Sequence, residues 1–450
     1  MILKTFLKNS ICIALLMVGH FAQAQFQTET RVKDNSPYSR LGLGDLFNQN
    51  FANIRSMGGL SAAFNAPMQV NLQNPASLGF LQATTFEAGL FGNFSQLSDA
   101  NQSADIWNGN IGYLSLGFAT KNQLNQVLDR KSSPWGWGMN FTLLPYSDVN
   151  YGVALETTVQ DTVDVANVFE GSGGTYRIMW GNGVRYKNMS IGVNLGYLFG
   201  KINNDRTLDI DQAGAYRVIT QKGISIRGFT WNAGAQYVHV FKKKTSEGET
   251  IKTGKILSVG IFGNNSTSFR TESNLLEYRS NNSFIDRDTL TNTTGLEQEG
   301  LLPSQLGVGF IYSKENNWKI GANYTLGNWS EYFNDGIPEG QDLNDSWELG
   351  LGGEYIPDNG SYNRYYKKIR YRAGVFYGKD PRLDLNNYGV SFGFGLPIVL
   401  PRQTASFINL GVELGQLSGA DEALLKENYI NFTAAFTLND NSWFFKRKFN

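Results

Sequence analysis

The chain has few of the residues on which most catalytic and metal sites depend. Its single cysteine is Cys12, close to the N-terminus, and its only histidines are His20 and His239. A zinc site needs several such ligands, and a Ser–His hydrolase needs its base within reach of the nucleophile. His239 shares a strand face with Trp231 and Tyr237, which predicts an interfacial position. We therefore expect no enzyme, cofactor or metal site.

Long apolar runs and an excess of charge of one sign are also lacking. The chain has 39 basic and 39 acidic side chains and a formal net charge of zero, which excludes the basic stripe of a nucleic-acid binder. After the N-terminus, no apolar run reaches the roughly 18 residues of a membrane-spanning helix. Membrane-spanning strands are not excluded, because only half of their residues are apolar.

The N-terminus has the layout of a secretion signal. Lys4 and Lys8 precede the apolar run 11–18, and Ala22-Gln23-Ala24 follows as a cleavage site. Residues 1–24 are therefore predicted to be a cleaved signal peptide, with the mature chain starting at about Gln25. Cys12 leaves with the signal, so the mature chain is expected to have no disulfide.

Most of the mature chain alternates apolar and polar residues with a period of two. In the range 428–438, for example, Phe432, Ala434 and Phe436 point one way while Asn431 and Thr433 point the other. Such segments behind a signal peptide predict an all-β fold, a transmembrane antiparallel β-barrel of about 14 strands. The predicted strands are 83–95, 110–120, 134–158, 173–186, 188–201, 224–242, 254–270, 304–314, 317–328, 345–356, 367–379, 386–397, 404–416 and 428–438.

Aromatic residues near the strand ends separate this fold from its alternative, a large soluble β-sandwich or propeller. They suit the two interfacial girdles of a barrel. The predicted girdle residues are Trp135, Trp137, Trp180, Tyr186, Trp329, Tyr332, Trp347, Tyr355 and Tyr377.

The connections fit the same fold. An even strand count returns both termini to the periplasm, where turns are short. Tight links at 187–188 and 315–316 fall on the side opposite to long polar ones at 201–223, 271–303 and 328–344. The connection 122–133 is expected to form a small helix, and Pro145 and Asp148 are expected to kink or split the strand 134–158.

Residues outside the strands form two further segments. In the range 25–82, Gly and Pro punctuation replaces the alternation, which predicts a compact N-terminal hatch or plug in the lumen of a barrel predicted to span 83–438. The range 439–450 is predicted to be a basic, aromatic periplasmic tail.

Several motifs occur in a defined order. Arg55-Ser56-Met57-Gly58-Gly59 precedes Asn74-Pro75-Ala76, the range 302–309 leads to Trp329-Ser330, and 350–357 is followed by 370–381. In this order the chain resembles the FadL-type outer-membrane transporters of long-chain fatty acids and other hydrophobic compounds. The resemblance implies a lumenal hatch, with gating residues Met57, Gly58, Gly59, Asn74, Pro75 and Ala76. Barrels of this type also include protein-binding accessory subunits of type IX secretion machinery, so fold alone does not determine function.

Four charged residues are expected to face the lumen. Arg370 and Arg372 share the polar face of one strand, and Glu348 and Glu354 share that of its neighbour, so cross-strand ion pairs are expected. The alternative is that one arginine remains unpaired and binds a fatty-acid head group.

Two further patterns have simple interpretations. Asp205, Asp209 and Asp211 match no established calcium loop, so solvated carboxylates are expected. Gly350, Gly352 and Gly353 lie within a strand, where they are expected to make room for lumenal contents or a bend.

These observations predict passage of hydrophobic small molecules, such as long-chain fatty acids, through a hatch-gated barrel in the bacterial outer membrane. The expected partners are membrane lipid and a hydrophobic ligand. The alternative is a non-transporting barrel subunit of an outer-membrane protein secretion or assembly complex, which binds another outer-membrane protein through its long outer loops and the basic residues Lys446 to Lys448. A continuous apolar pocket would favour transport, and a filled lumen would favour the subunit.

Overall fold

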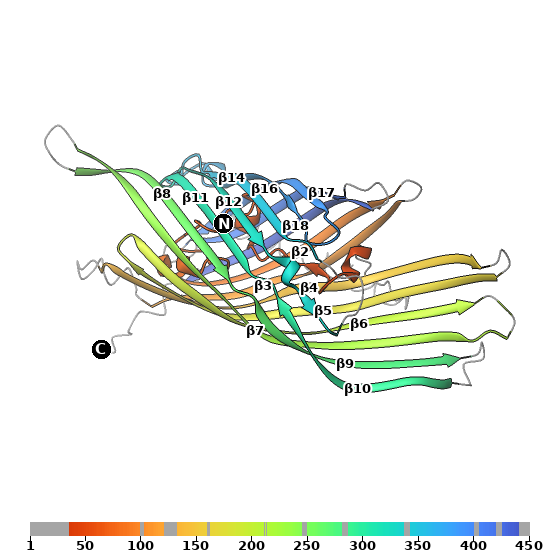
Figure 1. The fold of residues 1–450 in the computed structure, drawn as a ribbon. Helices are drawn as coiled ribbons and strands as arrows, with labels where there is room; N and C mark the ends of the chain where they lie inside the picture. The colour runs from red at the N-terminus through yellow and green to blue at the C-terminus, as the bar shows by residue number, and fades with distance from the viewer. Residues whose placement is uncertain are drawn as a thin grey trace, which may run out of the picture. The chain divides into compact units, whose positions relative to one another are not determined.

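The chain folds into a closed antiparallel barrel (Figure 1). The computed structural model describes residues 36–440 apart from 100–102, 121–132, 160–162, 211, 213, 245–249, 281–286, 337–342, 400–404 and 420–424. Fourteen strands form the ring in these residues, which confirms the predicted count. They are β2 (Thr84–Ser98), β3 (Ser103–Ala119), β4 (Trp135–Val159), β5 (Val163–Tyr186), β6 (Met189–Ile210), β7 (Arg217–Lys244), β8 (Thr250–Asn264), β11 (Gln305–Lys314), β12 (Trp318–Gly327), β14 (Ser346–Tyr355), β15 (Arg370–Lys379), β16 (Asn386–Val399), β17 (Ala405–Ser418) and β18 (Lys426–Asp440).

The ring closes between its first and last strands. β18 pairs with β2 from Lys426 opposite Ser98 to Asp440 opposite Thr84. On β18, Phe432 and Phe436 are exposed on the outer face, whereas Thr433 and Thr437 are buried. Closure of the ring pairs the edge strands, as the backbone requires in lipid, and the apolar exterior suits lipid contact, so this is an outer-membrane barrel. β2 starts and β18 ends at the same end, which is the periplasmic end in such barrels.

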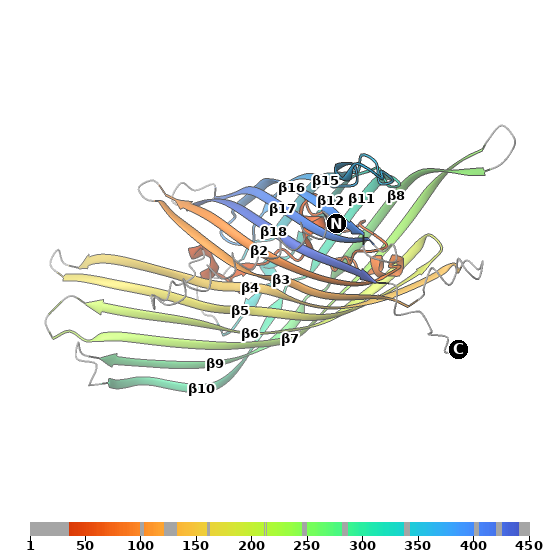
Figure 2. The same cartoon turned by 180° about the vertical axis from the view of Figure 1, so that it is seen from behind.

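The barrel wall is much taller on one side. β6 has 22 residues and β7 has 28, whereas β12 and β15 have 10 each. A spanning strand needs only about 9–11 residues. The long strands therefore continue beyond the membrane at the outer end (Figures 1 and 2), and the predicted loop 201–223 is wrong because β6 and β7 run through most of it.

A hairpin that the sequence analysis missed adds to the tall side. The predicted strand 254–270 ends at Asn264, and the predicted loop 271–303 is instead the hairpin of β9 (Thr267–Ser280) and β10 (Arg287–Leu302). β9 pairs with the outer half of β7, from Arg217 to Gly228, while β8 pairs with the rest of β7. β10 is exposed along most of its length, so it has no apolar face for a sequence pattern to reveal.

Two local expectations differ from the structure, and a third falls outside it. β4 is one continuous strand, so the predicted split is wrong, and a register shift between Pro145 and Ser147 accommodates the proline. Tyr332 is buried and not part of a girdle, because the loop that carries it folds inward. The helix expected at 122–133 and the tail 441–450 lie outside the described residues.

Residues 36–83, here called the lumenal segment, lie inside the ring (Figures 1 and 2). They include the short elements η2 (Pro37–Arg40), β1 (Asp45–Leu46), α2 (Ala52–Arg55) and η3 (Pro75–Phe80). β1 pairs with β4, and residues such as Phe51, Leu72 and Leu78 share a buried cluster with inward-facing Tyr113 and Met179.

An outer loop packs above this segment. It contains η4 (Trp329–Glu331) and β13 (Phe333–Asn334), which pairs with β10. Tyr332 and Leu343 join a buried cluster with Leu43 of the lumenal segment and Phe269 of β9. One further turn, η5 (Tyr365–Lys367), lies between β14 and β15. None of the helices in the described part of the chain is long and apolar enough to cross a membrane.

Candidate functional site: the lumen and its N-terminal segment

The Asn74 side chain holds the Asn74-Pro75-Ala76 element through hydrogen bonds to η3, to the lumenal segment and to the wall. Asn74 is fully buried and caps η3, because its Oδ1 accepts from the Ala76 amide at 3.1 Å. Its Nδ2 donates to the carbonyl oxygens of Ala62 at 2.6 Å and of Ile261 on β8 at 3.2 Å. A single side chain thus joins two parts of the lumenal segment to the wall.

The wall strands approach this element through glycines. A Cβ on Gly192 of β6 would lie 2.4 Å from the Pro75 carbonyl carbon, and one on Gly234 of β7 would lie 2.1 Å from Asn74 Oδ1. Real Cβ atoms are not found at such distances. The glycines therefore let the backbone of the lumenal segment lie directly on the sheet.

Met57 and Gly58 contact the opposite side of the wall in the same way. A Cβ on Gly350 would lie 1.9 Å from the Gly58 carbonyl oxygen, and one on Gly352 would lie 2.3 Å from that of Met57. Gly58 has a positive φ of 65° and Gly59 one of 77°, which glycine adopts without strain. The interpretation that Gly350 and Gly352 make room for lumenal contents is confirmed, whereas a Cβ on Gly353 would meet the backbone of Lys319 instead.

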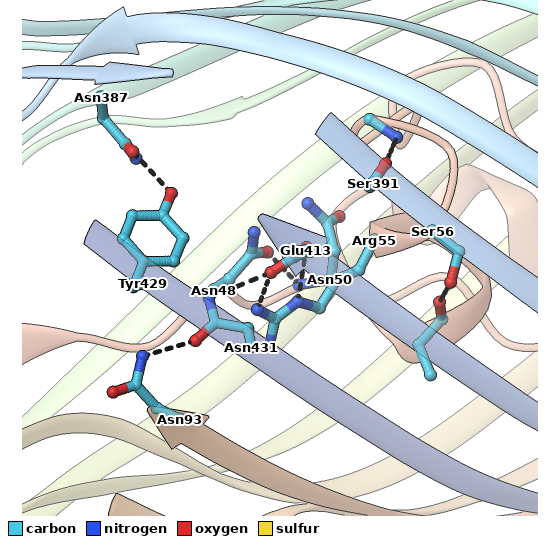
Figure 3. A network of polar contacts seen from close by, with 12 residues as sticks. Asn48, Asn50, Arg55, Ser56, Asn93, Asn387, Ser391, Glu413, Tyr429 and Asn431 are labelled. Atoms are coloured by element: carbon cyan, nitrogen blue, oxygen red, sulfur yellow. Dashed lines mark hydrogen bonds and ion pairs between the residues drawn. The ribbon is translucent and has the colours of Figure 1, made fainter. Parts of the chain in front are cut away.

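A buried ion pair connects α2 to the wall (Figure 3). Arg55 makes a bidentate contact with Glu413 of β17, and its Nε lies 3.0 Å from Oε1. Asn431 of β18 donates to the same carboxylate at 3.2 Å and accepts from Asn93 of β2 at 2.7 Å. The guanidinium and its surroundings therefore form one network across three strands.

Three of the four predicted lumenal charges come together. The Glu354 carboxylate receives Arg372 Nε at 2.9 Å, with Lys319 Nζ at 3.1 Å and Arg370 Nη1 at 4.0 Å. Arg372 also donates to Asn409 at 2.7 Å. Glu348 is not part of this group, and the described residues provide it with no ion pair.

A further ion-pair group fixes the first part of the lumenal segment. Arg382, in the connection between β15 and β16, donates to Asp380 at 2.7 Å and pairs with Asp45 of β1. Burial lowers the pKa of the Arg382 guanidinium, but the Asp380 and Asp45 carboxylates outweigh this effect and raise it. The arginine therefore stays charged.

Two cavities flank the lumenal segment, with volumes of about 220 and 320 Å³. Glu348 lines both of them. The other polar lining side chains of the smaller one include Asp45, Arg55, Asn93, Asp148, Arg382, Glu413, Glu427 and Asn431. Those of the larger one include Asn48, Gln49, Asn50, Gln73, Arg177, Asn232, Asn264, Gln305, Asn323 and Asn387. Charged and amide groups are thus prominent in both spaces, beside apolar side chains such as Phe47.

A family model decides which family this barrel represents. The model named BamG matches residues 6–450. The chain belongs to the BamG family. No curated protein matches it.

The fold of this BamG-family barrel is shared with FadL-type structures. The toluene transporter TbuX of Ralstonia pickettii is 13% identical, with a TM-score of 0.51 over 91% of this chain and 99% of that one. The toluene transporter TodX of Pseudomonas putida is 15% identical, with a TM-score of 0.50 over 89% and 100%. A Pseudomonas aeruginosa FadL homologue is 11% identical, with a TM-score of 0.51 over 88% and 99%. The predicted resemblance is confirmed for the fold.

Sequence reasoning missed most of the wall residues that hold the lumenal segment of this BamG-family chain. Asn194 donates to the Leu72 carbonyl at 2.7 Å, Asn323 accepts from the Ala62 amide at 2.9 Å, and Gln236 donates to the Ala62 carbonyl at 2.9 Å. In the sequence, each of them is only an amide on the inner face of a strand. Many polar residue types would keep the lumen hydrated at such a position, so the sequence does not reveal the contact with the lumenal segment.

The remaining candidates lie away from the lumen. His239 is exposed on the outer face, with its ring centroid 4.8 Å from that of Phe241, as its strand register predicts. Asp209 pairs with Arg217, so it is not free to bind calcium, and Asp211 lies outside the described residues.

Proposed function

We propose that this BamG-family barrel is a non-transporting, non-enzymatic subunit of an outer-membrane protein assembly or secretion complex. The single observation that supports this best is the position of residues 36–83 inside the ring (Figures 1 and 2). Those residues are tied to the wall by an ion pair, amide hydrogen bonds and glycine contacts on several strands.

The chemistry of the remaining space supports the same conclusion. A hydrophobic ligand needs a largely apolar pocket with few polar groups. Carboxylates, guanidinium groups and amides line both lumenal cavities, and moving an apolar molecule through them would require desolvating these groups without new hydrogen bonds. Packing by the outer loop adds a second closure above the lumenal segment.

The part of the wall that extends beyond the bilayer at the outer end, here called the overhang, provides surface for a protein partner. The long wall of β4 to β7 with β9 and β10 extends beyond the bilayer, and β10 is exposed along most of its length. A transporter of small molecules does not need such a wall, whereas a subunit can use it for contact.

Hatch-gated passage of hydrophobic small molecules, such as long-chain fatty acids, is the second candidate. It is favoured by the fold shared with two proteins described as toluene transporters. In that case Met57, Gly58, Gly59, Asn74, Pro75 and Ala76 would have to leave their glycine contacts, and Arg370 or Arg372 would have to release Glu354 to bind a carboxylate head group.

Native mass spectrometry of the protein, extracted in mild detergent from its own membrane, separates the two candidates. A constant protein partner at fixed stoichiometry with an empty barrel is the expected result. Retained fatty acid on a solitary barrel would overturn it in favour of transport. In that event, uptake of labelled oleate should fall in Arg372→Gln and not in Arg206→Gln, which changes an exposed arginine of the overhang.

A further inference from the structure

Three consecutive periplasmic turns of the barrel carry an excess of cations, most of them exposed and two of them, Lys367 and Lys368, partly buried. The strands β7, β8, β11, β12, β14 and β15 are neighbours in the ring, so the turns β7–β8, β11–β12 and β14–β15 form one continuous arc of its periplasmic end. The Ile356 amide donates to the Asn317 carbonyl at 2.6 Å, which joins the last two turns directly. We call the cations of this arc the basic rim: Lys242, Lys243, Lys244, Lys252, Lys255, Lys314, Arg364, Lys367 and Lys368.

The basic rim has few counter-charges. Within the described parts of the chain, none of its nine side chains forms an ion pair. The acidic residues in the described turns are Glu315 and Asp358, and Asp358 already accepts from the Gly360 amide at 3.0 Å. Between β7 and β8 the sequence adds Glu247 and Glu249, so nine cations stand against four acidic residues.

The register of the strands places like charges opposite one another. Lys242 is the cross-strand partner of Lys252, and Lys255 is that of Lys314. Like charges directly opposite destabilise a sheet. An anion between the strands removes this repulsion, so the pattern points to an anionic ligand at the rim.

The aromatic residues beside the rim place it at the surface of the bilayer. The Phe241 ring contacts His239 at 4.8 Å and Tyr312 at 6.1 Å between centroids, and Tyr312 contacts Trp318 at 5.4 Å. Tyr355 is exposed and pairs with Trp318 across the sheet. Aromatic rows of this kind lie at the level of lipid head groups, so the lysines next to them lie where phosphates are.

The β14–β15 turn extends the same surface. Tyr362 is 96% exposed, and Tyr365 and Tyr366 are about half exposed. Hydrogen bonds from Tyr365 to the Pro397 carbonyl at 3.1 Å and from Tyr371 to the Tyr366 carbonyl at 3.0 Å hold the turn against the barrel rim. Its tyrosines and Arg364 are therefore exposed on a fixed support.

We propose that the basic rim binds the phosphate head groups of anionic phospholipids in the periplasmic leaflet. Charge complementarity and the adjoining aromatic row favour this occupant. Each basic residue near an anionic bilayer surface contributes roughly a fivefold gain in binding, so several cations in one arc select anionic over neutral lipid. This inference does not depend on the proposed function, because it needs no protein partner and no transport.

The test compares the full chain in nanodiscs of phosphatidylcholine alone and with added phosphatidylglycerol. Native mass spectrometry counts the phosphatidylglycerol molecules that remain bound after release from the disc. The rim variant carries Lys242→Gln, Lys243→Gln, Lys252→Gln and Lys255→Gln. The control variant removes four cations at the outer end by Arg206→Gln, Arg279→Gln, Arg287→Gln and Lys379→Gln.

We expect the wild type and the control to retain phosphatidylglycerol in preference to phosphatidylcholine. In the rim variant this preference should fall by at least about tenfold. Added salt should weaken retention by the wild type, because the rim is exposed. If the rim variant does not fold, Lys367→Gln with Lys368→Gln should lower retention without touching a strand. Equal retention by all variants would overturn the proposal. It would also be overturned if the rim variant lost an acidic protein from native membranes while its lipid preference was unchanged, because the rim would then bind protein.

Discussion

Arg55 and Glu413 show how single side chains couple the lumenal segment to the wall. Both side chains are more than nine-tenths buried, so water compensates poorly for either charge if its partner is removed. We expect Glu413→Gln to destabilise the protein by about 3–5 kcal/mol, the usual cost of breaking a buried pair. Urea unfolding in lipid vesicles, followed by tryptophan fluorescence, measures this change.

The double variant Arg55→Met with Glu413→Leu is the control for that prediction. Replacing both partners leaves no unpaired charge, so much of the lost stability should return. A Glu413→Gln variant as stable as the wild type would show that the pair contributes little to holding α2.

At the same scale, strand alternation predicted which residues face inward and not what they contact there. It placed Glu354, Arg370 and Arg372 on inner faces, and the structure brings them together. It placed Glu348 beside them, but Glu348 faces the cavities instead. Which group an inward-facing side chain contacts depends on the path of the lumenal segment. That path follows no sequence period, so alternation cannot predict it.

The strands differ in how far the sequence predicts them, for a reason that lies in their surroundings. Within the bilayer a strand has a lipid face and a lumenal face, so apolar and polar residues alternate and all fourteen ring strands were predictable. Outside the bilayer both faces meet water. β10, with Thr289, Thr293 and Thr294 on exposed positions, therefore has the composition of a loop.

The β9–β10 hairpin should be dispensable for the ring. β8 pairs with β11 directly over its last ten residues, so the barrel closes without β9 or β10. We expect a variant in which a short Gly-Ser turn replaces residues 272–297 to fold, with the heat-dependent gel mobility of an intact barrel. This variant keeps Phe269 and Leu302, which pack in the outer cluster.

Failure of this variant to form a barrel would contradict the independence of ring and overhang. If it folds, native mass spectrometry of the same variant also tests whether the overhang contributes to partner binding.

The glycines of β14 and β15 test the close fit between the lumenal segment and the sheet. A Cβ at Gly350 would lie 1.9 Å from the Gly58 carbonyl oxygen, so Gly350→Ala must displace backbone. We expect a loss of about 1–3 kcal/mol or more, as for other overpacked sites. Unfolding in vesicles measures this loss.

Gly92→Ala is the matched control, because a Cβ there would have no atom within 4 Å, and its effect should stay within about 0.5 kcal/mol. Equal effects of the two substitutions would mean that the segment does not press on the wall.

For the whole molecule, the two closures predict how the barrel conducts ions. The lumenal segment lies inside the ring, and Tyr332 and Leu343 of the outer loop pack with its residue Leu43 in one buried cluster. Because the two closures lie one above the other, opening one leaves the other in place. We expect the wild type in a planar bilayer to show no steady conductance.

Variants that loosen each closure separately and together test this arrangement. Tyr332→Ala with Leu343→Ala loosens the outer loop, and Gly350→Ala with Gly374→Ala displaces the lumenal segment, since a Cβ at Gly374 would lie 2.2 Å from the Gly58 amide nitrogen. Each pair alone should leave the conductance close to that of the wild type, and all four substitutions together should produce long-lived open events. Steady conductance in the wild type would contradict a filled lumen. Full opening by the outer pair alone would mean that the lumenal segment does not seal the barrel, and would remove the main support for a non-transporting role.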